Sequence, residues 1–289
     1  MKQIIAVSLA CVTFVFSGCI TKLERNGVPT KEQASLAVVS GYSQSIRLVG
    51  YGDEEMFFSE LNEFLKDMRV DGGADGKLTM LSLSGGGENG AYAAGLINGW
   101  HEAGNCPEFD IVTGVSTGSL IAPLAFLGVP YHEILKRAYT EIDVNNILIK
   151  KSLYRIMHEP ESLTDSTPLR ELIESVFDEK TMVRVAEEHR KGRRLFVVTT
   201  NLDERAGVMW NIGAIANSGN PDSLHLIHKL LLASSSIPMV FQPVLIDVTI
   251  EEETYDELHV DGGVVAQSFG SGLFNTKTIK ESEDSVPIE

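Results

Sequence analysis

The chain has few cysteines and few basic residues, and both shortages restrict its function. Three cysteines occur among 289 residues, at Cys11, Cys19 and Cys106. Cys106 has no metal-ligand neighbour in the sequence, so we expect neither a disulfide framework nor a metal site built on cysteine. Lys and Arg total 24 against 40 for Asp and Glu, which gives a formal net charge of −16. Such a chain lacks the basic surface that binding to nucleic acid or to an anionic bilayer requires.

Long apolar runs are also missing, which argues against a transmembrane protein. A membrane-spanning helix needs about 18 or more apolar residues. The apolar run at the beginning of the chain extends only from Ile4 to Phe16, after Lys2 and before Ser17-Gly18-Cys19. This pattern predicts a secretory signal over residues 1–18.

The residues at the end of that signal resemble the lipobox of bacterial lipoproteins. The segment in question is Phe16-Ser17-Gly18-Cys19. The resemblance implies that Cys19 is acylated and becomes the mature N-terminus. We then expect an exported lipoprotein, anchored to a membrane through its N-terminus and facing the bacterial periplasm or lying in the outer membrane. The alternative is an ordinary signal peptide followed by a coincidental cysteine.

The rest of the chain has the composition of a globular protein, with 43% hydrophobic and 22% charged residues. The polar segment 19–45 is predicted to be a lipidated tether. Residues 46–76 are predicted to form an N-terminal helical extension, with a helix over 54–70. The main domain is expected over 77–270, followed by an acidic C-terminal tail over 271–289.

Within the main domain, strand and helix patterns alternate. Strands are predicted over 77–83, 109–113, 195–200, 244–250 and 257–260, and helices over 88–102, 120–127, 169–177 and 224–233. Alternation of this kind is typical of α/β proteins whose mostly parallel central sheet is covered by helices on both faces.

A glycine-rich turn follows the first of these strands. Residues 84–90 read Ser-Gly-Gly-Gly-Glu-Asn-Gly. A phosphate-binding loop is ruled out, because Ala91 and Tyr92 stand where Lys and Ser or Thr are needed. A dinucleotide site remains possible, although the acidic residue Asp110 begins the second strand rather than ending it. A third reading is an oxyanion hole, in which main-chain N–H groups receive negative charge. A tight turn without a ligand also remains open.

The second strand ends in Gly114-Val115-Ser116-Thr117-Gly118, a G-x-S-x-G pattern. Such a pattern between a strand and a helix describes a sharp turn that exposes a nucleophilic serine. Ser116 needs a base. No histidine follows Asp261, so a triad in the order Ser, Asp, His cannot use that aspartate. Asp261 at a strand end is the favoured base; Asp203 or Asp247 acting with His259 is the minor alternative.

Taken together, these motifs resemble the patatin-like phospholipases. The ordered set is Gly85-Gly86-Gly87-x-x-Gly90, Gly114-x-Ser116-x-Gly118 and Asp261-Gly262-Gly263, with Ala233-Ser234-Ser235-Ser236-Ile237-Pro238 before the aspartate. The resemblance covers roughly residues 77–267. Asn89 departs from the pattern, because many members carry Arg or Lys at its position.

The resemblance implies a three-layer α/β/α patatin-like fold with a mostly parallel central sheet. It further implies a Ser116–Asp261 catalytic dyad, an oxyanion hole from Gly85, Gly86, Gly87 and Gly90, and hydrolysis of fatty acyl esters of phospholipids or related lipids. No metal or organic cofactor is expected. Two other hypotheses stay open: an inactive lipid- or partner-binding lipoprotein with a hydrolase-like domain, and a nucleotide-binding enzyme.

Overall fold

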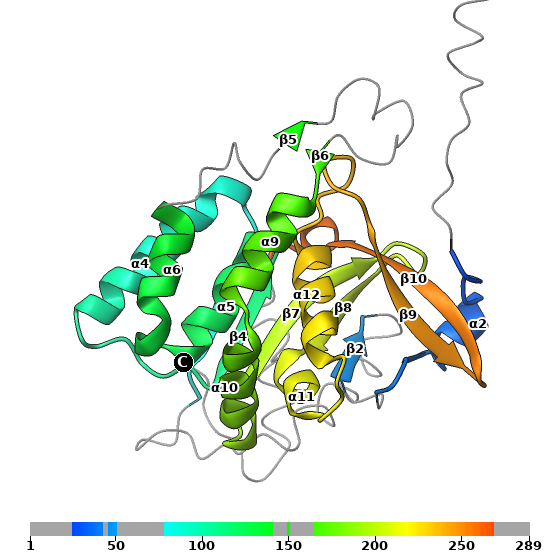
Figure 1. Cartoon of the computed structure of the whole chain (residues 1–289), viewed down its shortest axis with the longest axis horizontal. Helices are drawn as coiled ribbons and strands as arrows, with labels where there is room; N and C mark the ends of the chain where they lie inside the picture. The colour runs from blue at the N-terminus through cyan, green and yellow to red at the C-terminus, as the bar shows by residue number, and fades with distance from the viewer. Residues whose placement is uncertain (1–24, 43–45, 51–77, 141–148, 151–163, 269–289) are drawn as a thin grey trace, which may run out of the picture.

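The computed structural model describes residues 25–42, 46–50, 78–140, 149–150 and 164–268. An eight-stranded sheet forms its centre (Figure 1). Its strands are β1 (Val38–Val39), β2 (Arg47–Val49), β3 (Met80–Leu83), β4 (Ile111–Val115), β7 (Arg194–Asn201), β8 (Ala206–Asn211), β9 (Val244–Ile250) and β10 (Glu253–Asp261). A separate short pair consists of β5 (Ile149–Lys150) and β6 (Thr164–Asp165). All five predicted strands are present; β9 has the predicted ends and the other four have shifted ends.

The prediction of a mostly parallel sheet is wrong. Only β3 with β4 and β4 with β7 pair in parallel, whereas five other pairs are antiparallel. The reason lies in the connections. Helices link the parallel strands, but β9 and β10 are joined by Glu251 and Glu252 alone, both with positive φ, which is the geometry of a tight hairpin. The strand β8, which the sequence analysis missed, forms a second hairpin with β7.

Two strands meet end to end along one edge of β7. On that edge, β4 pairs in parallel with residues 194–198, and β10 pairs antiparallel with residues 199–201. The other edge is occupied by β8 over residues 196–201, so β4 and β10 share the same side. Since β4 and β10 run toward each other, the residue after β4 and the last residue of β10 converge at one point. Those two residues are Ser116 and Asp261.

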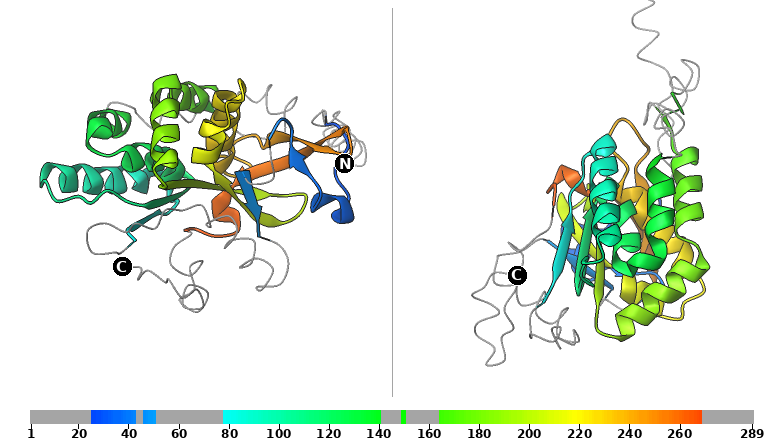
Figure 2. Two further views of the ribbon diagram at one scale, coloured as in Figure 1. Left: turned by 90° about the horizontal axis from the view of Figure 1, so that it is seen from below. Right: turned by 90° about the vertical axis from the view of Figure 1, so that its left-hand side faces the viewer.

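The helices are α2 (Lys31–Ala34), α4 (Gly90–Glu102), α5 (Thr117–Leu127), α6 (His132–Thr140), α9 (Thr167–Val176), α10 (Glu179–Arg190), α11 (Ile212–Asn217) and α12 (Ser223–Ser234), with 3-10 turns η2 (Gly87–Asn89), η3 (Val129–Tyr131) and η4 (Gly262–Val264). Figure 2 shows the long helices together on one face of the sheet. The described residues supply no second helical layer, so of the predicted three-layer arrangement they contain two layers.

The core lies between that helical layer and the sheet. The strands β4 and β7 are buried along their whole length, in agreement with the apolar runs 111–112 and 195–198 within them. Trp210, Phe126 and Phe196 are among the largest fully buried side chains. In α5, Pro123 is buried inside the helix, and every residue from Ile121 to Phe126 belongs to the core. The helix that carries Ser116 at its N-terminus is therefore held firmly against the sheet.

Part of the predicted tether belongs to the folded domain. Within residues 19–45, β1 pairs with β9, and Arg25 forms an ion pair with Asp203 at 2.6 Å. The side chain of Asn26 also donates to Asp256. The domain therefore begins earlier than predicted, because this polar segment satisfies its hydrogen bonds on the sheet rather than in water.

A buried charged network ties β2 to β10. Arg47 forms an ion pair with Glu257 at 2.5 Å, and both side chains are almost inaccessible. His259 contacts the same carboxylate through Nε2, and its Nδ1 forms a hydrogen bond with the hydroxyl of Thr199 at 2.8 Å. Burial alone would raise the pKa of Glu257, but the hydrogen bond from His259 and the charge of Arg47 outweigh it and lower that pKa to about 2. Glu257 is thus ionised at neutral pH.

Several predictions fall outside the described residues. These are the signal over 1–18 with Cys19, the helix over 54–70 and the acidic tail over 271–289. In the part of the chain that is described, no helix has both the length and the apolar character needed to span a bilayer.

Candidate active site

Ser116 occupies a strained turn between β4 and α5. Its backbone has φ 52° and ψ −127°, in a region that residues other than glycine rarely adopt. The glycines on either side permit this turn. A Cβ on Gly114 would lie 2.6 Å from the carbonyl oxygen of Gly118, and a Cβ on Gly118 would lie 2.4 Å from that of Leu83. Both positions therefore exclude any larger residue.

The structure brings Ser116 and Asp261 together although 145 residues separate them. The Oγ of Ser116 donates a hydrogen bond to Oδ2 of Asp261 at 2.6 Å. The second oxygen, Oδ1, accepts from the amide of Gly263 at 2.7 Å, which fixes the orientation of the carboxylate. Gly262 is required between them, because a Cβ there would lie 2.5 Å from the carbonyl oxygen of Val198.

The carboxyl group of Asp261 is a stronger proton acceptor than an ordinary aspartate. Burial raises its pKa, and the hydrogen bonds from Ser116 and Gly263 lower it without cancelling that effect. The side chain is 5% exposed. A buried carboxylate beside a buried hydroxyl is a suitable general base for that hydroxyl.

The hydroxyl groups at the end of α12 hold the main chain of Ser116. Ser234 Oγ accepts from the amide of Ser116 at 3.1 Å and donates to the carbonyl of Val198 at 2.7 Å. Ser235 Oγ donates to the carbonyl of Ser116 at 3.3 Å. The main-chain amide of Asp261 bonds to the carbonyl of Ser236 at 3.0 Å. One serine run thus contacts the backbone of both members of the Ser116–Asp261 pair.

The glycine-rich turn lies directly against the nucleophile. A Cβ on Gly85 would lie 3.0 Å from the Cβ of Ser116. Gly86 and Gly87 have φ values of 155° and 54°, so the backbone here depends on glycine. The hydroxyl of Thr117 donates to the carbonyl of Gly87 at 3.0 Å.

Two further contacts fix the beginning of α4 beside that turn. Gly90 is packed so closely against Thr117 that a Cβ would lie 2.0 Å from its methyl group. Asn89, the residue at which many patatin-like phospholipases carry a basic side chain, is solvent-exposed and lies over Gly86. No charge therefore stands at this position beside the turn.

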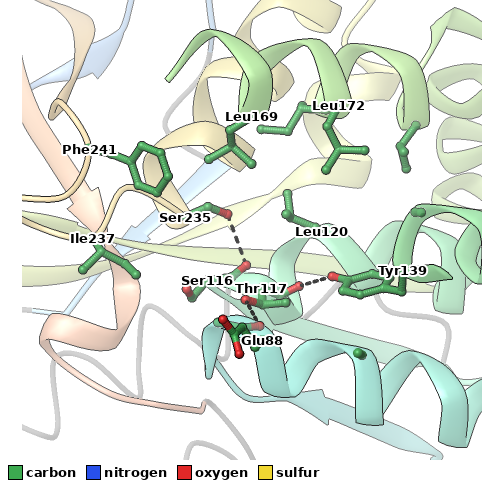
Figure 3. A pocket seen from close by; sticks show the side chains of 15 residues that line it. Glu88, Ser116, Thr117, Leu120, Tyr139, Leu169, Leu172, Ser235, Ile237 and Phe241 are labelled. Carbon is green, nitrogen blue, oxygen red and sulfur yellow. Dashed lines mark hydrogen bonds between the residues drawn. The ribbon is translucent and has the colours of Figure 1, made fainter. Parts of the chain in front are cut away.

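An apolar pocket opens at Ser116 and extends between α5, α6 and α9 (Figure 3). Its volume is about 220 Å³. Figure 3 shows Leu120, Leu169 and Leu172 on one side of the serine and Ile237 and Phe241 on another. The residues that line it are Gly87, Glu88, Ala91, Ser116, Thr117, Leu120, Ala138, Tyr139, Leu169, Leu172, Ile173, Val176, Ser235, Ile237 and Phe241. Glu88 is the one ionisable carboxylate among them.

The alternative base is not supported by the geometry. His259 is fully buried, and its two ring nitrogens contact Thr199 and Glu257. Asp203 is paired with Arg25, and Asp247 is paired with Lys229 at the surface. Neither aspartate bonds to His259, so the proposed triad is not assembled.

The dinucleotide reading fails for a similar reason. Asp110 accepts from the amide and the hydroxyl of Thr79 at 2.7 and 2.9 Å, where β3 and β4 begin. The glycine-rich turn follows the other end of β3. An acidic residue at the opposite end of the strands cannot contact a ribose bound at that turn.

The roles of Ser234 and Ser235 and the contribution of α6 and α9 to the pocket were missed from the sequence. Three consecutive serines at a helix end were the available signal, but the partner of each hydroxyl depends on how α12 packs on β7. Tyr139 and Leu169 carry no pattern that distinguishes a pocket wall from core.

Comparison with known proteins indicates the family to which the chain is related. A model described as patatin-like phospholipase matches residues 81–268. Uncharacterized protein R571 of Acanthamoeba polyphaga mimivirus is 27% identical over 194 residues, which are 66% of this chain and 59% of the viral protein. The cUMP-AMP-activated phospholipase of Escherichia coli is 31% identical over 112 residues, 38% of this chain and 32% of that protein. The chain thus matches less than two thirds of the length of either relative.

Among solved structures, VipD from Legionella pneumophila is similar with a TM-score of 0.42 and 15% identity, covering 67% of this chain and 47% of VipD. This likeness is too weak to add to the assignment. The family model, in contrast, spans well over half of the chain and includes both Ser116 and Asp261. The chain therefore belongs to the patatin-like phospholipase family.

Proposed function

We propose that this protein hydrolyses acyl ester bonds of lipids, with Ser116 as nucleophile and Asp261 as general base. The observation that carries the proposal is the 2.6 Å hydrogen bond from Ser116 Oγ to Asp261 Oδ2 at the mouth of an apolar pocket. A serine hydroxyl in contact with a base is the arrangement required for nucleophilic catalysis. An apolar cavity next to it suits a fatty acyl chain.

The reaction begins when Ser116 Oγ attacks the acyl carbonyl and its proton passes to Asp261. The raised pKa of Asp261 favours this transfer. The tetrahedral intermediate places negative charge on the former carbonyl oxygen. Main-chain amides of Gly86 and Gly87 are the proposed donors to that oxygen, because the amide of Gly85, the other residue expected to contribute, already donates to the carbonyl of Gln267 at 3.0 Å. Gly90 allows α4 to begin beside them.

Collapse of the intermediate breaks the ester bond, and the alcohol leaves with the proton held by Asp261. The acyl group remains on Ser116. Water then attacks the acyl carbonyl and gives a proton to Asp261, and release of the fatty acid returns that proton to Ser116 Oγ. Asp261 accepts and donates in both halves, so no metal or organic cofactor is needed for the sequence of steps.

We also propose that the protein acts as an exported, membrane-anchored lipoprotein with lipid on Cys19. The support is the sequence alone: the signal pattern over 1–18 and the lipobox-like residues before Cys19. Intact mass spectrometry of the mature protein tests this proposal. A mature N-terminus at Cys19 with the added mass of acyl chains is expected, and Cys19→Ser should lose both the added mass and the membrane fraction.

The decisive experiment for the activity compares the products of three proteins by lipid mass spectrometry. Native protein should release fatty acids from phospholipid, and Ser116→Ala should release none. Ser175→Ala, which removes an exposed hydroxyl bonded to a helical carbonyl of α9, serves as the matched control and should retain turnover. Equal release by native protein and Ser116→Ala would exclude Ser116 as the nucleophile. Absence of release by native protein, with no labelling of Ser116 by a fluorophosphonate, would favour the inactive lipid-binding alternative.

A further inference from the structure

Three of the segments beside Ser116 carry no charge. Residues 89–100, 233–246 and 262–268 contain no Asp, Glu, Lys or Arg, in a chain that is 22% charged and has a net charge of −16. Main-chain hydrogen bonds tie two of these segments to the site. The amide of Asp261 bonds to Ser236, and the amide of Gly85 bonds to Gln267, each at 3.0 Å. Ala91 of the first stretch and Ile237 and Phe241 of the second line the pocket, so all three uncharged stretches lie beside the site.

Each of these segments also exposes apolar side chains to solvent. On α4, Tyr92 and Leu96 lie one helical turn apart and are 78% and 59% exposed. Met239 is 76% exposed, and Val264 and Val265 after the aspartate are about half exposed. We call these five residues the apolar rim. A cluster of exposed apolar residues next to a pocket is a mark of an interaction surface.

The turn that carries Met239 is built to hold this side chain outward. The amides of Val240 and Phe241 both bond to the carbonyl of Ile237, at 3.1 and 3.0 Å. Phe241 is buried and lines the pocket. Met239 has φ 69°, an unfavourable conformation for a residue with a side chain. The turn thus buries Phe241 and leaves the large apolar side chain of Met239 in solvent.

Two residues of the rim lie close in the chain to residues that line the pocket. Ala91, which lines the pocket, is followed in α4 by Tyr92, and Ile237 lines it two residues before Met239. Figure 3 shows Ile237 and Glu88, next to the beginning of α4, on different sides of Ser116. A surface that covers the rim therefore faces the entrance through which a substrate reaches the serine.

We infer that the apolar rim docks on a lipid surface whose headgroups carry no net charge. This inference rests on the proposed function, since a lipid must leave such a surface to reach Ser116. Tyrosine and aliphatic side chains are suited to the boundary between headgroups and acyl chains. The acidic chain would be repelled by anionic lipid, and Glu88 at the entrance would add to that repulsion. A zwitterionic surface avoids both costs.

The test measures binding to phosphatidylcholine vesicles by flotation. All proteins carry Ser116→Ala and Cys19→Ser, so that no lipid is consumed and no attached acyl chain contributes to binding. The double variant Tyr92→Glu with Met239→Glu should lower the vesicle partition coefficient by about tenfold or more, because two inserted side chains become charged. The matched control is Leu36→Glu, whose leucine is similarly exposed but lies next to β1 at the far edge of the sheet.

A second measurement separates the rim from the chemistry. With Ser116 intact, the double variant should hydrolyse a soluble short-chain ester at the native rate and phosphatidylcholine in vesicles far more slowly. Unchanged partition of the double variant, or stronger native binding to phosphatidylglycerol than to phosphatidylcholine vesicles, would overturn the inference. So would a native dimer that the double variant dissociates without any change in vesicle binding. If native protein hydrolyses neither ester, the proposed function fails, and the flotation result still decides the role of the rim.

Discussion

Ser234 is expected to contribute more to stability than its neighbour Ser236, although the two appear equivalent in the sequence. Both side chains are completely buried. Ser234 links the amide of Ser116 to the carbonyl of Val198, at 3.1 and 2.7 Å. Ser236 donates only to the carbonyl of Leu232, which also accepts from the amide of Ser235. The same Ser→Ala change therefore leaves different groups without partners.

The magnitudes follow from those partners. In Ser234→Ala the buried amide of Ser116 loses its acceptor, which costs about 1–3 kcal/mol, and loss of the bond to Val198 adds about 1 kcal/mol. In Ser236→Ala the carbonyl of Leu232 keeps a donor, so the loss should be about 1 kcal/mol. We expect the free energy of unfolding to fall by about 2–4 kcal/mol in the first variant and by about 1 kcal/mol in the second.

Urea denaturation followed by circular dichroism measures both values, provided that the m-value is unchanged between variants. The same proteins can be labelled with a fluorophosphonate. Because Ser234 fixes the strained turn of Ser116, Ser234→Ala should label more slowly under conditions where it is fully folded, and Ser236→Ala should label at nearly the native rate. Equal losses of stability in the two variants would refute the argument that the bond to Ser116 distinguishes them.

Two further predictions concern buried carboxylates. Because burial raises the pKa of Asp261, its ionised form is disfavoured in the folded protein, and kcat/KM should fall on the acid side at a pH above the ordinary aspartate value of 3.8. The variant Asp261→Asn should be inactive yet more stable than native protein at pH 7. This difference in stability should vanish below pH 3.8. A fall of kcat/KM centred at or below pH 3.8 would contradict this prediction. Glu257 behaves in the opposite way: its pKa of about 2 means that its stabilisation is present above 4.5 and lost as pH falls toward 2. Arg47→Ala leaves that buried carboxylate without its main cation, so the free energy of unfolding measured with urea should fall by about 3–5 kcal/mol at pH 7 and by clearly less at pH 3. A loss of stability that is the same at both pH values would show that the Arg47–Glu257 pair does not have this role.

The sequence predicted the residues of the candidate site better than the sheet that assembles them. Local patterns specify the turn at Ser116, because the glycines at 114 and 118 have a direct steric role. Sheet direction is a different matter. The strands predicted at 244–250 and 257–260 give the core positions but not the direction of pairing, which is set by the two-residue connection at Glu251 and Glu252. A reading based on alternation of strands and helices passes over such a short hairpin.

Burial was predictable for apolar residues and not for charged ones. The apolar run within β7 identified a core strand. In contrast, no pattern in the sequence near Arg47 indicates that its side chain pairs with Glu257, 210 residues away. Polar pairs of this kind depend on which strands become neighbours, and that is decided by the whole chain. The same limit applied to residues 25–42, whose polar composition is equally compatible with a tether and with a segment hydrogen-bonded to the sheet.

The antiparallel direction of β10 is also what brings the proposed base into direct contact with the proposed nucleophile. Here β4 and β10 approach each other along one edge of β7, so Ser116 and Asp261 meet end to end at hydrogen-bond distance. Direct contact removes the need for an intermediate base, and burial at the same junction raises the pKa of the carboxyl group. Strand direction thus supplies the proximity, and burial supplies the raised pKa, on which the proposed chemistry depends.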